Sequence, residues 1–440
     1  MHVLYAIASW ILFLALLPVL LTHPKLRHGI PFRLGFYRRS FDAGRGSPRI
    51  WLHGASAGDL LSLEPVMREL KRRLPGCCLV VTTMTNSGLA MARKRLSGTA
   101  DVVLYAPYDL PLATRRAVRR LAPDLLVLEY TEIWPNLIRA TRAAGARIAL
   151  TNGRFSPDRL SRYHAFFRAI GNPLLDIDLF LMRSDEEAER ALRLGAPPDR
   201  VWVTGNTKFD ALALEPDPAR AEALCRDMGL DPQAPVFMAG STHEGEEELV
   251  LEVYRGLLAR RPGLQLVIAP RYVERAGRIM ALAVEAGFSV RLRSGGAAAG
   301  SAQVTVLDTI GELATAYRLA TLVFVGGSFV RRGGQNVLEP AGQGRPVLFG
   351  PHMENFKDSL QVLVGRGGIQ VATPEQLLKV AQELLARPAK IAELGELARE
   401  AVSQIRGASG RNVDHMLRVL PRARAGEPVA AAEAPARIQP

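Results

Sequence analysis

At 440 residues the chain is longer than one hydrophobic core usually organises, so its length predicts two domains. Hydrophobic residues make up 48% and charged residues 22%, which argues against a disordered body, and the net charge of +13 indicates an anionic partner. The three cysteines, Cys77, Cys78 and Cys225, cannot form a disulfide framework and include no CxxC pair. We therefore expect a reducing compartment and no zinc ribbon.

The first apolar segment, Val3 to Leu21, carries no charged residue. As a helix it would span roughly 28 Å, about one hydrocarbon core, so we predict a transmembrane anchor over residues 1–22. A cleaved signal peptide is the alternative, but no Lys or Arg precedes the segment and no small-residue cleavage site follows it. Basic residues follow instead, in a segment that we place at residues 23–47. The positive-inside rule then leaves the body in the cytoplasm.

Basic residues also recur in clusters through the first half of the chain. Each cluster by itself is either a solvated helix face or a surface for an anionic partner, which is a nucleic acid, a phosphorylated metabolite or a lipid head group. Their repetition beside a membrane segment favours an anionic membrane or lipid over nucleic acid.

Past the anchor, short runs of β-branched residues and leucine alternate with amphipathic helical stretches, as in parallel sheets whose strands are buried on both faces. The first series of predicted strands is Arg49–Ala55, Leu79–Met84, Asp101–Ala106, Leu125–Leu128, Arg147–Thr151, Leu179–Met182 and Val201–Thr204. The second is Val236–Ala239, Gln265–Ala269, Ser289–Leu292, Val304–Leu307, Leu322–Val325 and Pro346–Phe349. We predict an α/β fold of two doubly wound, Rossmann-like domains facing each other across a cleft, with ligands outside the carboxyl ends of the strands.

Changes in composition give the expected domain boundaries. The first domain is predicted at residues 48–206 and the second at 236–420. Residues 207–235, rich in Pro, Ala and charge, are expected to form a hinge or linker between them. From 421 to 440 the chain is mostly Ala, Pro, Glu and Arg, which cannot bury a core, so we expect a disordered tail.

The stretch from Gly326 to Pro340 combines two glycine pairs with Asn336, a good helix N-cap residue, and with Glu339 three positions later. Glycine lets the backbone approach a ligand closely, and a helix N-terminus favours phosphate. Glu339 either closes a capping box with Asn336 or accepts the two ribose hydroxyls of a nucleotide. The spacing alone leaves both readings open, and it matches neither a GxGxxG fingerprint nor a P-loop.

Six motifs follow one another along the chain: Trp51 to Asp59 (WLHGASAGD), Thr131 to Asn136 (TEIWPN), Gly205 to Asp210 (GNTKFD), Gly240 to Glu247 (GSTHEGEE), Ala269 to Arg271 (APR), and the stretch from Gly326 to Pro340 continued by Gly350 to Phe356 (GPHMENF). Together they resemble the bacterial 3-deoxy-D-manno-octulosonic acid (Kdo) transferase family of lipopolysaccharide biosynthesis. The resemblance runs from the anchor to about residue 410. Six ordered motifs are far more specific than any single one.

The resemblance implies a glycosyltransferase of the GT-B fold at the cytoplasmic face of a bacterial inner membrane. The first domain would be the acceptor side and the second the nucleotide-sugar domain. The expected partners are CMP-Kdo as donor, a lipid A precursor as acceptor and anionic lipids of the inner membrane, with no nucleic acid. Transfer would invert the anomeric carbon without a cofactor or an essential metal.

The resemblance also implies a donor site. In the matching positions Arg271 would contact the CMP phosphate. Gly327, Ser328 and Asn336 would lie near that phosphate, and Glu339 would bind the ribose. An arginine and a helix N-terminus stabilise the charge on a phosphate leaving group, which gives this set a physical reason.

The acceptor hydroxyl needs a general base, and in the family a glutamate at the end of the first motif has this role. Asp59 stands there in this chain, one methylene shorter, and Glu132 of the second motif is the other catalytic candidate. The second motif departs as well: Tyr130 precedes Thr131 where the family has glutamate, and Glu129 is displaced by one position. If Asp59 is not the base, Glu129 or Glu132 is next.

These departures keep two alternatives open, a GT-B homologue with another acceptor or donor and a donor-binding homologue that has lost transfer. Gln335 and Tyr272 also replace histidines that the family usually carries. His243-Glu244 lacks the second histidine of a zinc-binding HExxH helix, so no metal ligands are predicted. His53, at a predicted strand end, is either a packed core residue or a residue of the site.

Overall fold

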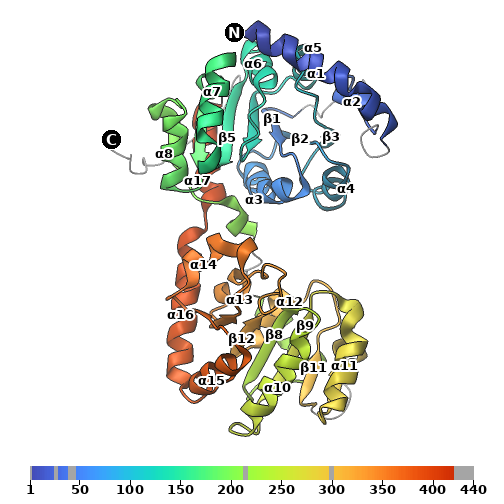
Figure 1. The fold of residues 1–440 in the computed structure, drawn as a ribbon, viewed down its shortest axis with the longest axis vertical. Coiled ribbons are helices and arrows are strands. Elements are labelled where there is room, and N and C mark those ends of the chain that lie inside the picture. The colour runs from blue at the N-terminus through green and yellow to red at the C-terminus, as the bar shows by residue number, and fades with distance from the viewer. Residues whose placement is uncertain (1, 24–27, 38–45, 212–216, 297–301, 421–440) are drawn as a thin grey trace. The chain divides into compact units, whose positions relative to one another are not determined.

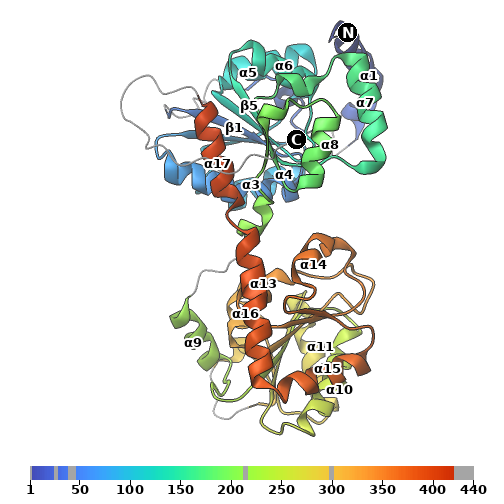
Figure 2. The ribbon, with the colours of Figure 1, turned by 90° about the vertical axis from the view of Figure 1, so that its left-hand side faces the viewer.

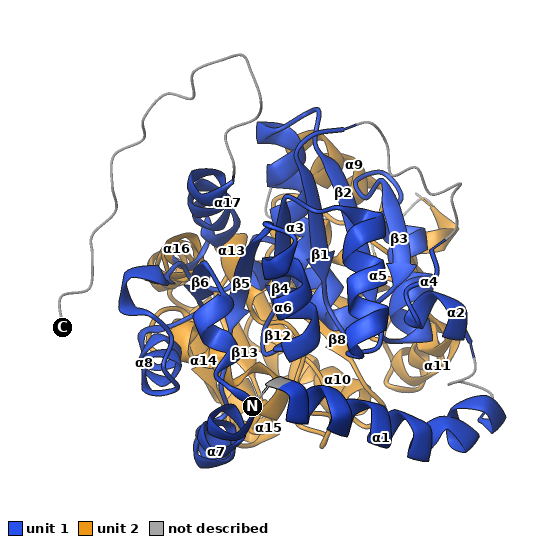
Figure 3. Cartoon of the chain, turned by 90° about the horizontal axis from the view of Figure 1, so that it is seen from above, with its two compact units in different colours: residues 1–211, 405–440 blue, residues 212–404 orange. Residues whose placement is uncertain are grey.

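The structure is a computed structural model that describes residues 2–23, 28–37, 46–211, 217–296 and 302–420. The chain forms two compact units, unit 1 from Met1–Ala211 with Ile405–Pro440 and unit 2 from Leu212–Gln404 (Figure 3). The expected tail at 421–440, residues 24–27 and 38–45 of the expected basic segment, and residues 212–216 of the expected linker lie outside the described residues.

Unit 1 is built on a seven-stranded parallel sheet with the strand order β3-β2-β1-β4-β5-β6-β7 (Figure 1). Its strands are β1 Arg49–His53, β2 Cys78–Thr83, β3 Val102–Tyr105, β4 Leu125–Glu129, β5 Arg147–Gly153, β6 Leu179–Met182 and β7 Val201–Val203. Its helices are α1 His2–Thr22, α2 Ile30–Arg33, α3 Ala57–Arg73, α4 Asn86–Arg95, α5 Pro111–Leu121, α6 Pro135–Ala143, α7 Leu160–Ile170, α8 Asp185–Arg193 and α17 Ala408–Val419.

Both faces of this sheet are buried, which explains why the middle of each strand is mainly apolar on both faces. Successive residues of a strand point to opposite faces. Trp51 therefore packs into one core cluster, whereas Ile50 and Leu52 pack into the other, and all three side chains are fully buried. The helical crossovers supply the opposing apolar faces, as the continuous apolar runs predict.

Unit 2 repeats the architecture with the strand order β10-β11-β9-β8-β12-β13-β14, again all parallel. Its strands are β8 Val236–Thr242, β9 Gln265–Pro270, β10 Val290–Leu292, β11 Val304–Val306, β12 Leu322–Val325, β13 Val347–Phe349 and β14 Gly368–Gln370. Its helices are α9 Pro218–Asp227, α10 Glu246–Leu258, α11 Ala276–Glu285, α12 Leu313–Ala316, α13 Leu338–Gly342, α14 Lys357–Leu363, α15 Pro374–Leu385 and α16 Pro388–Ile405, whose last residue belongs to unit 1.

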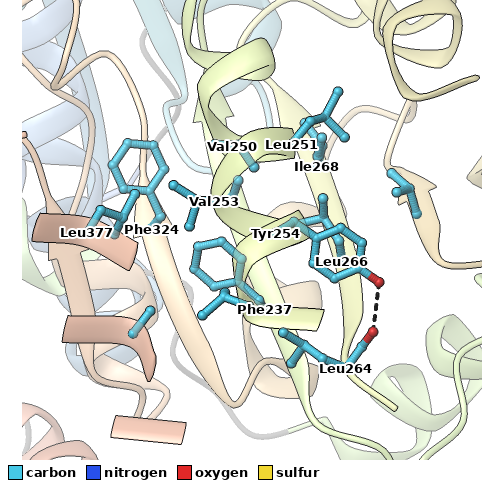
Figure 4. Close-up of a cluster of buried hydrophobic side chains, with 14 of the residues drawn as sticks. Phe237, Val250, Leu251, Val253, Tyr254, Leu264, Leu266, Ile268, Phe324 and Leu377 are labelled. Carbon is cyan, nitrogen blue, oxygen red and sulfur yellow. Dashed lines mark hydrogen bonds between the residues drawn. The ribbon is translucent and has the colours of Figure 1, made fainter. Parts of the chain in front are cut away.

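The core of unit 2 lies between its sheet and α10, where Phe237 and Tyr254 are fully buried (Figure 4). The Tyr254 hydroxyl donates to the Leu264 carbonyl oxygen at 2.7 Å, so the one polar atom of that ring is satisfied inside the apolar cluster. A buried phenol without such an acceptor would lose roughly 1–3 kcal/mol of stability.

The last helix, α17, packs on unit 1 rather than on unit 2, where the expected range 236–420 placed it. Val413 and Met416 are fully buried in the unit 1 core, and Figure 2 shows α17 beside the strands of that unit. Asp210 accepts the backbone N–H groups of Gly407 and Ser409, both at 2.6 Å, so the end of the GNTKFD motif holds the start of this helix.

Within the described residues one helix, Val3–Thr22 of α1, has the length and composition to cross a membrane. Part of its surface contacts the rest of unit 1: the Tyr5 hydroxyl donates to Asp109 Oδ2 at 2.8 Å, and the Phe13 ring lies against Tyr108. The rest of its apolar surface is open, with Val3 69% and Ile11 63% exposed. A soluble domain would bury such a surface.

Candidate functional site

A chain of hydrogen bonds crosses the carboxyl ends of β1 and β2. The Trp51 indole N–H donates to Thr82 Oγ1 at 2.8 Å, and Nδ1 of His53 lies 3.0 Å from the same oxygen. Nε2 of His53 lies 3.3 Å from Glu132 Oε2, which also accepts the Trp134 indole N–H at 2.7 Å. Because a carboxylate only accepts, Nε2 of His53 carries a proton that points toward Glu132. The buried His53 thus orients Glu132.

Asp59 lies in the first turn of α3 and closes a capping box with Ser56. The Ser56 N–H donates to Asp59 Oδ2 at 2.8 Å, and the Asp59 N–H donates to Ser56 Oγ at 3.4 Å. The helix-start role that the sequence allows for Asp59 is therefore present. Within the described residues no other hydrogen bond reaches this half-buried carboxylate, so Oδ1 is open to a ligand.

Glu129, at the end of β4, is fully buried and accepts two side-chain hydrogen bonds. The donors are Thr151 Oγ1 at 2.5 Å and Asn152 Nδ2 at 2.6 Å. Burial raises the pKa of Glu129 to about 8; the two hydrogen bonds lower it, while the charges of Asp59 and Glu132 raise it. Asp59 of the first motif and Glu132 of the second are therefore each close enough to Glu129 to interact with it electrostatically.

Two residues beside Glu129 have left-handed backbone, Tyr130 with φ 54° and Asn152 with φ 50°. A bulky residue such as tyrosine rarely adopts this conformation, and such outliers gather at functional sites. The Tyr130 hydroxyl lies 2.9 Å from Ser62 Oγ of α3, which ties the second motif to the helix that begins near Asp59.

Thr207 of the third motif, GNTKFD, forms hydrogen bonds with Asn152 of β5 and Ser62 of α3. The Thr207 N–H donates to Asn152 Oδ1 at 2.9 Å, and Asn152 Nδ2 donates to Thr207 Oγ1 at 2.7 Å. The Thr207 hydroxyl donates in turn to the Ser62 carbonyl oxygen at 2.7 Å. These buried bonds connect β5, the 3₁₀ turn Thr207–Ala211 and α3, so the motif holds α3 in position.

In unit 2 a fully buried carboxylate, Glu246, lies at the start of α10 beside the glycine-rich stretch. Its Oε2 accepts the N–H groups of His243 at 2.9 Å and Gly327 at 2.7 Å. Its Oε1 accepts those of Ser328 and Phe329, both at 3.0 Å. Sequence reasoning expected Gly327 and Ser328 beside a phosphate, but their amides already have an acceptor, so this loop is shaped by Glu246.

The Ser328 side chain is also committed: its hydroxyl donates to the Val325 carbonyl oxygen at 2.6 Å and accepts the Gly350 N–H at 2.9 Å. Gly327 itself has φ +67°, and a Cβ there would lie 3.2 Å from both Gln335 and His243. Glycine is therefore needed at position 327 for two reasons, the left-handed backbone conformation and the close packing of these neighbours.

Asn336 lies just before helix α13, and its side chain accepts a hydrogen bond from the start of that helix. Helix α13 begins two residues later, at Leu338, whose N–H donates to Asn336 Oδ1 at 3.1 Å. Asn336 Nδ2 donates to Glu339 Oε1 at 3.0 Å, so Glu339 bonds the side chain of Asn336 instead of closing a capping box. Burial raises the pKa of Glu339, and the bond from Asn336 opposes this.

His243 follows the end of β8 and is the centre of a positively charged region. Gln335 Nε2 lies 3.2 Å from His243 Nε2; since the amide nitrogen only donates, Nε2 of His243 is unprotonated. Burial lowers the pKa of His243, Glu246 opposes this, and the charges of Arg332, Arg271 and Arg275 lower it further. The region therefore favours a neutral imidazole surrounded by guanidinium groups.

Two of these arginines have no carboxylate partner within the described residues. Arg275 pairs with Glu247 at 3.0 Å, but Arg271 and Arg332 form no ion pair there, and both are exposed. The Arg271 guanidinium lies over the Tyr272 ring, 5.5 Å from its centroid. An exposed, unpaired guanidinium beside a buried loop is suited to an anionic ligand.

No group of three or more His, Cys, Asp and Glu side chains that fits a metal ion occurs in the part of the chain that the structure describes. Glu244, in the pattern considered for zinc, is 84% exposed and lies 3.7 Å from Arg275.

The structure therefore brings Asp59 and Glu132 together around Glu129 in unit 1. In unit 2 it gathers Gly327, Ser328, Asn336 and Glu339 near the ends of β8, β12 and β13, with Arg271 after β9. Sequence reasoning missed the role of Glu246, whose bonded partners in the glycine-rich loop lie 81 to 83 positions away in the chain.

Comparison with known proteins covers most of the chain. Residues 28–211 match the family model described as 3-deoxy-D-manno-octulosonic-acid transferase (kdotransferase). The 3-deoxy-D-manno-octulosonic acid transferase of Bordetella pertussis is 34% identical over 376 residues, covering 83% of this chain and 86% of that protein. The protein of the same name from Haemophilus influenzae is 31% identical over 406 residues, covering 91% of this chain and 93% of that protein.

Among solved structures, UDP-GlcNAc 2-epimerase from Neisseria meningitidis, bound to UDP-GlcNAc, matches with a TM-score of 0.58 at 14% identity. The match covers 84% of this chain and all of that protein, and it shows the shared fold alone. With the two parallel α/β sheets, it places this chain in the GT-B fold class. The identities of more than 30% over four fifths or more of the chain go further: the chain belongs to the 3-deoxy-D-manno-octulosonic acid transferase family and is a glycosyltransferase.

Proposed function

We propose that the protein transfers Kdo from CMP-Kdo to a lipid A precursor, in lipopolysaccharide assembly at the cytoplasmic face of the inner membrane. The observation that carries the proposal is the 34% identity with the Bordetella pertussis transferase over 83% of the chain. The chemistry of the two carboxyl-edge clusters supports it, because one gathers carboxyl groups and the other gathers cations.

The donor binds in unit 2 in this proposal. Arg271 and Arg332, both exposed and without ion pairs in the described residues, neutralise the phosphate of CMP-Kdo. Glu339 accepts the ribose hydroxyls from the position in which Asn336 holds it, 3.0 Å away. Gly327 and Ser328 have an indirect role, since their amides are bonded to Glu246 and only keep the loop in shape.

The acceptor is activated in unit 1. Asp59 Oδ1 takes the proton from the acceptor hydroxyl while its Oδ2 stays bonded to the Ser56 N–H. The hydroxyl oxygen then attacks the anomeric carbon of Kdo from the face opposite the phosphate. The carbon–oxygen bond to CMP breaks, CMP leaves with the electron pair, and the configuration inverts. Glu132, held by His53 and Trp134, orients the acceptor.

The membrane anchor in this proposal is α1, because most of its apolar surface is exposed. Lys25 and Arg27 follow it in the sequence and would meet the anionic lipids of the cytoplasmic leaflet. The anchor keeps the acceptor cluster near a substrate that is itself a lipid.

A second candidate, a donor-binding homologue without transfer activity, is favoured by one observation: Asp59 is already used in a capping box and is shorter than the family's glutamate. The two candidates separate in one assay. The full-length chain in nonionic detergent is incubated with CMP-Kdo and lipid A precursor, and CMP release and product mass are recorded.

We expect a product heavier than the acceptor by one or more Kdo units, with stoichiometric CMP. Arg271→Gln should weaken donor binding, whereas Asp59→Asn should leave it intact and remove transfer. CMP-Kdo binding without product from the parent chain would reject the transferase proposal for this acceptor and favour the second candidate.

A further inference from the structure

Unit 2 contains a cavity of about 750 Å³ at the sheet edge opposite the donor cluster. Its lining includes Val236 at the amino end of β8, Thr321 just before β12 and Arg345 just before β13. Helix α9 and the start of α16 also contribute residues, and both helices are labelled in Figure 2. The glycine-rich loop and Arg271 follow carboxyl ends of strands, so they belong to the other edge.

Three arginines line this cavity: Arg261, which is exposed, and Arg318 and Arg345, which are half-buried. The last two are held by hydrogen bonds to neutral groups. Arg318 Nη1 donates to Gln343 Oε1 at 3.1 Å, and Arg345 Nη2 donates to the Arg318 carbonyl oxygen. In the described part of the chain neither guanidinium forms an ion pair, and the buried Nε of Arg345 has no hydrogen-bond partner. That Nε is too buried to reach a ligand, so the donors that remain for one are Nε and Nη2 of Arg318 and Nη1 of Arg345.

This arrangement is unfavourable without an anion. Burial lowers the pKa of Arg345, and the positive charge of Arg318 lowers it further. Guanidinium groups are fully charged at neutral pH, so the two cations repel each other at low solvent exposure. Elsewhere in the unit a comparable arginine, Arg293, is compensated by Asp227 and Glu312, both at 3.0 Å.

The acidic residues that line the cavity do not compensate the charges of Arg318 and Arg345 in this way. Asp231 is exposed, and its carboxylate accepts the Gln233 N–H at 2.9 Å. Glu222 is exposed on α9 and forms no ion pair in the described residues. The walls are otherwise largely apolar, with Leu319, Leu385 and Ile391 among them, which suits an organic ligand better than a bare ion.

We propose that this cavity is a second anion site, which binds a phosphate-bearing small molecule through Arg318 and Arg345. The planar guanidinium fork matches phosphate oxygens in pairs, and one dianion would compensate both charges. A ligand here would act from the far edge of the nucleotide-sugar unit, so it would regulate or stabilise unit 2 without occupying the donor cluster.

The test follows thermal unfolding of the full-length chain in nonionic detergent, with inorganic phosphate as the probe and sodium chloride at equal ionic strength as the reference. Binding to the folded state raises the melting temperature by an amount that grows with ligand concentration. We expect this phosphate increment in the parent and its loss in Arg318→Gln and in Arg345→Gln. The increment is compared within each variant, so a change in its basal stability does not matter.

Matched variants sharpen the result. Arg278→Gln removes one exposed charge from α11 and should keep the increment. Arg271→Gln removes one charge from the donor cluster and measures how much of the increment comes from phosphate bound there. Glu222→Gln should enlarge it, since it removes a negative charge from the lining. An increment that survives in both cavity variants, that disappears in Arg271→Gln, or that never exceeds the chloride reference would overturn the proposal.

A second arm adds phosphatidylglycerol to the detergent micelles in place of phosphate. Stabilisation by free phosphate that depends on Arg318 and Arg345 identifies a soluble ligand. The same dependence with the lipid alone identifies a lipid head group as the source of the bound phosphate.

Discussion

Glu129 and Glu246 are fully buried glutamates near the carboxyl ends of parallel strands, one in each unit. Glu246 accepts four backbone N–H groups, two on each oxygen, so its charge is spread over rigid donors. Glu129 accepts only two side-chain bonds and interacts with the charges of Asp59 and Glu132, and its pKa is raised to about 8. Equal burial therefore has different consequences. Glu246 fixes the shape of the glycine-rich loop, whereas Glu129, close to two other carboxylates, has a raised pKa and favours the protonated form.

The largest expected effect concerns the acidic cluster. Asp59→Asn should lower transfer by about 10²–10⁴-fold, because the amide cannot accept the acceptor proton, while CMP binding persists. Asp59→Glu should retain or raise activity. CMP release and calorimetric CMP titration measure the two properties separately.

Ser56→Ala is the matched control, since it breaks the capping box and leaves the Asp59 carboxylate in place. It should cost about 1 kcal/mol of stability and change transfer only a few-fold. Transfer at the parental rate by the Asp59→Asn variant would move the base to Glu129 or Glu132.

The proton on Glu129 should appear in the pH dependence of stability. Its pKa is raised from 4.5 to about 8 in the folded state, so its stabilising contribution is complete below pH 4.5 and is lost as pH rises through 8. Each pKa unit is worth about 1.4 kcal/mol, so over the 3.5 units between these two values the full loss should be on the order of 5 kcal/mol. Glu129→Gln mimics the protonated form and should flatten the unfolding free energy measured from pH 5 to 8.5. Equal slopes for variant and parent would show that Glu129 is ionised throughout.

Glu246→Gln tests the other side of the comparison. Either placement of the new amide turns an NH₂ group toward two backbone N–H groups, which should cost about 2–4 kcal/mol of unfolding free energy in denaturant titrations. Glu248→Gln, an exposed change in the same helical turn, should stay within about 0.5 kcal/mol of the parent. If the two variants are equally stable, the four bonds contribute little.

The smallest expected effect is at Glu339. Glu339→Ala should weaken CMP binding by about 1.5–3 kcal/mol in calorimetric titration, because a charge-assisted ribose contact is lost. The melting temperature should change little, since Glu339 closes no capping box. An unchanged CMP affinity with a lower melting temperature would reverse this assignment and make Glu339 a structural residue.

The strands could be predicted because a parallel strand that is buried on both faces consists of a short continuous run of apolar residues, such as Leu322–Val325. The exception is β14, Gly368–Gln370, a three-residue edge strand without such a run. The family motifs also identified where polar residues gather. Local patterns could not show that Glu246 occupies the glycine loop or that α17 packs on unit 1, because those contacts join residues far apart in the chain. The roles of Asp59, Glu132 and the donor residues stay predictions until the variants are assayed.

The return of α17 to unit 1 has a consequence for how this protein can be divided. A gene fragment encoding only residues 1–211 would omit Val413 and Met416 and leave part of the unit 1 core open to water. A single cut after Ala211 would be different, because the carboxyl fragment would still carry α17. We expect the two fragments of such a split chain to stay joined through about a dozen helical residues and to copurify, as subunits do, without a covalent link.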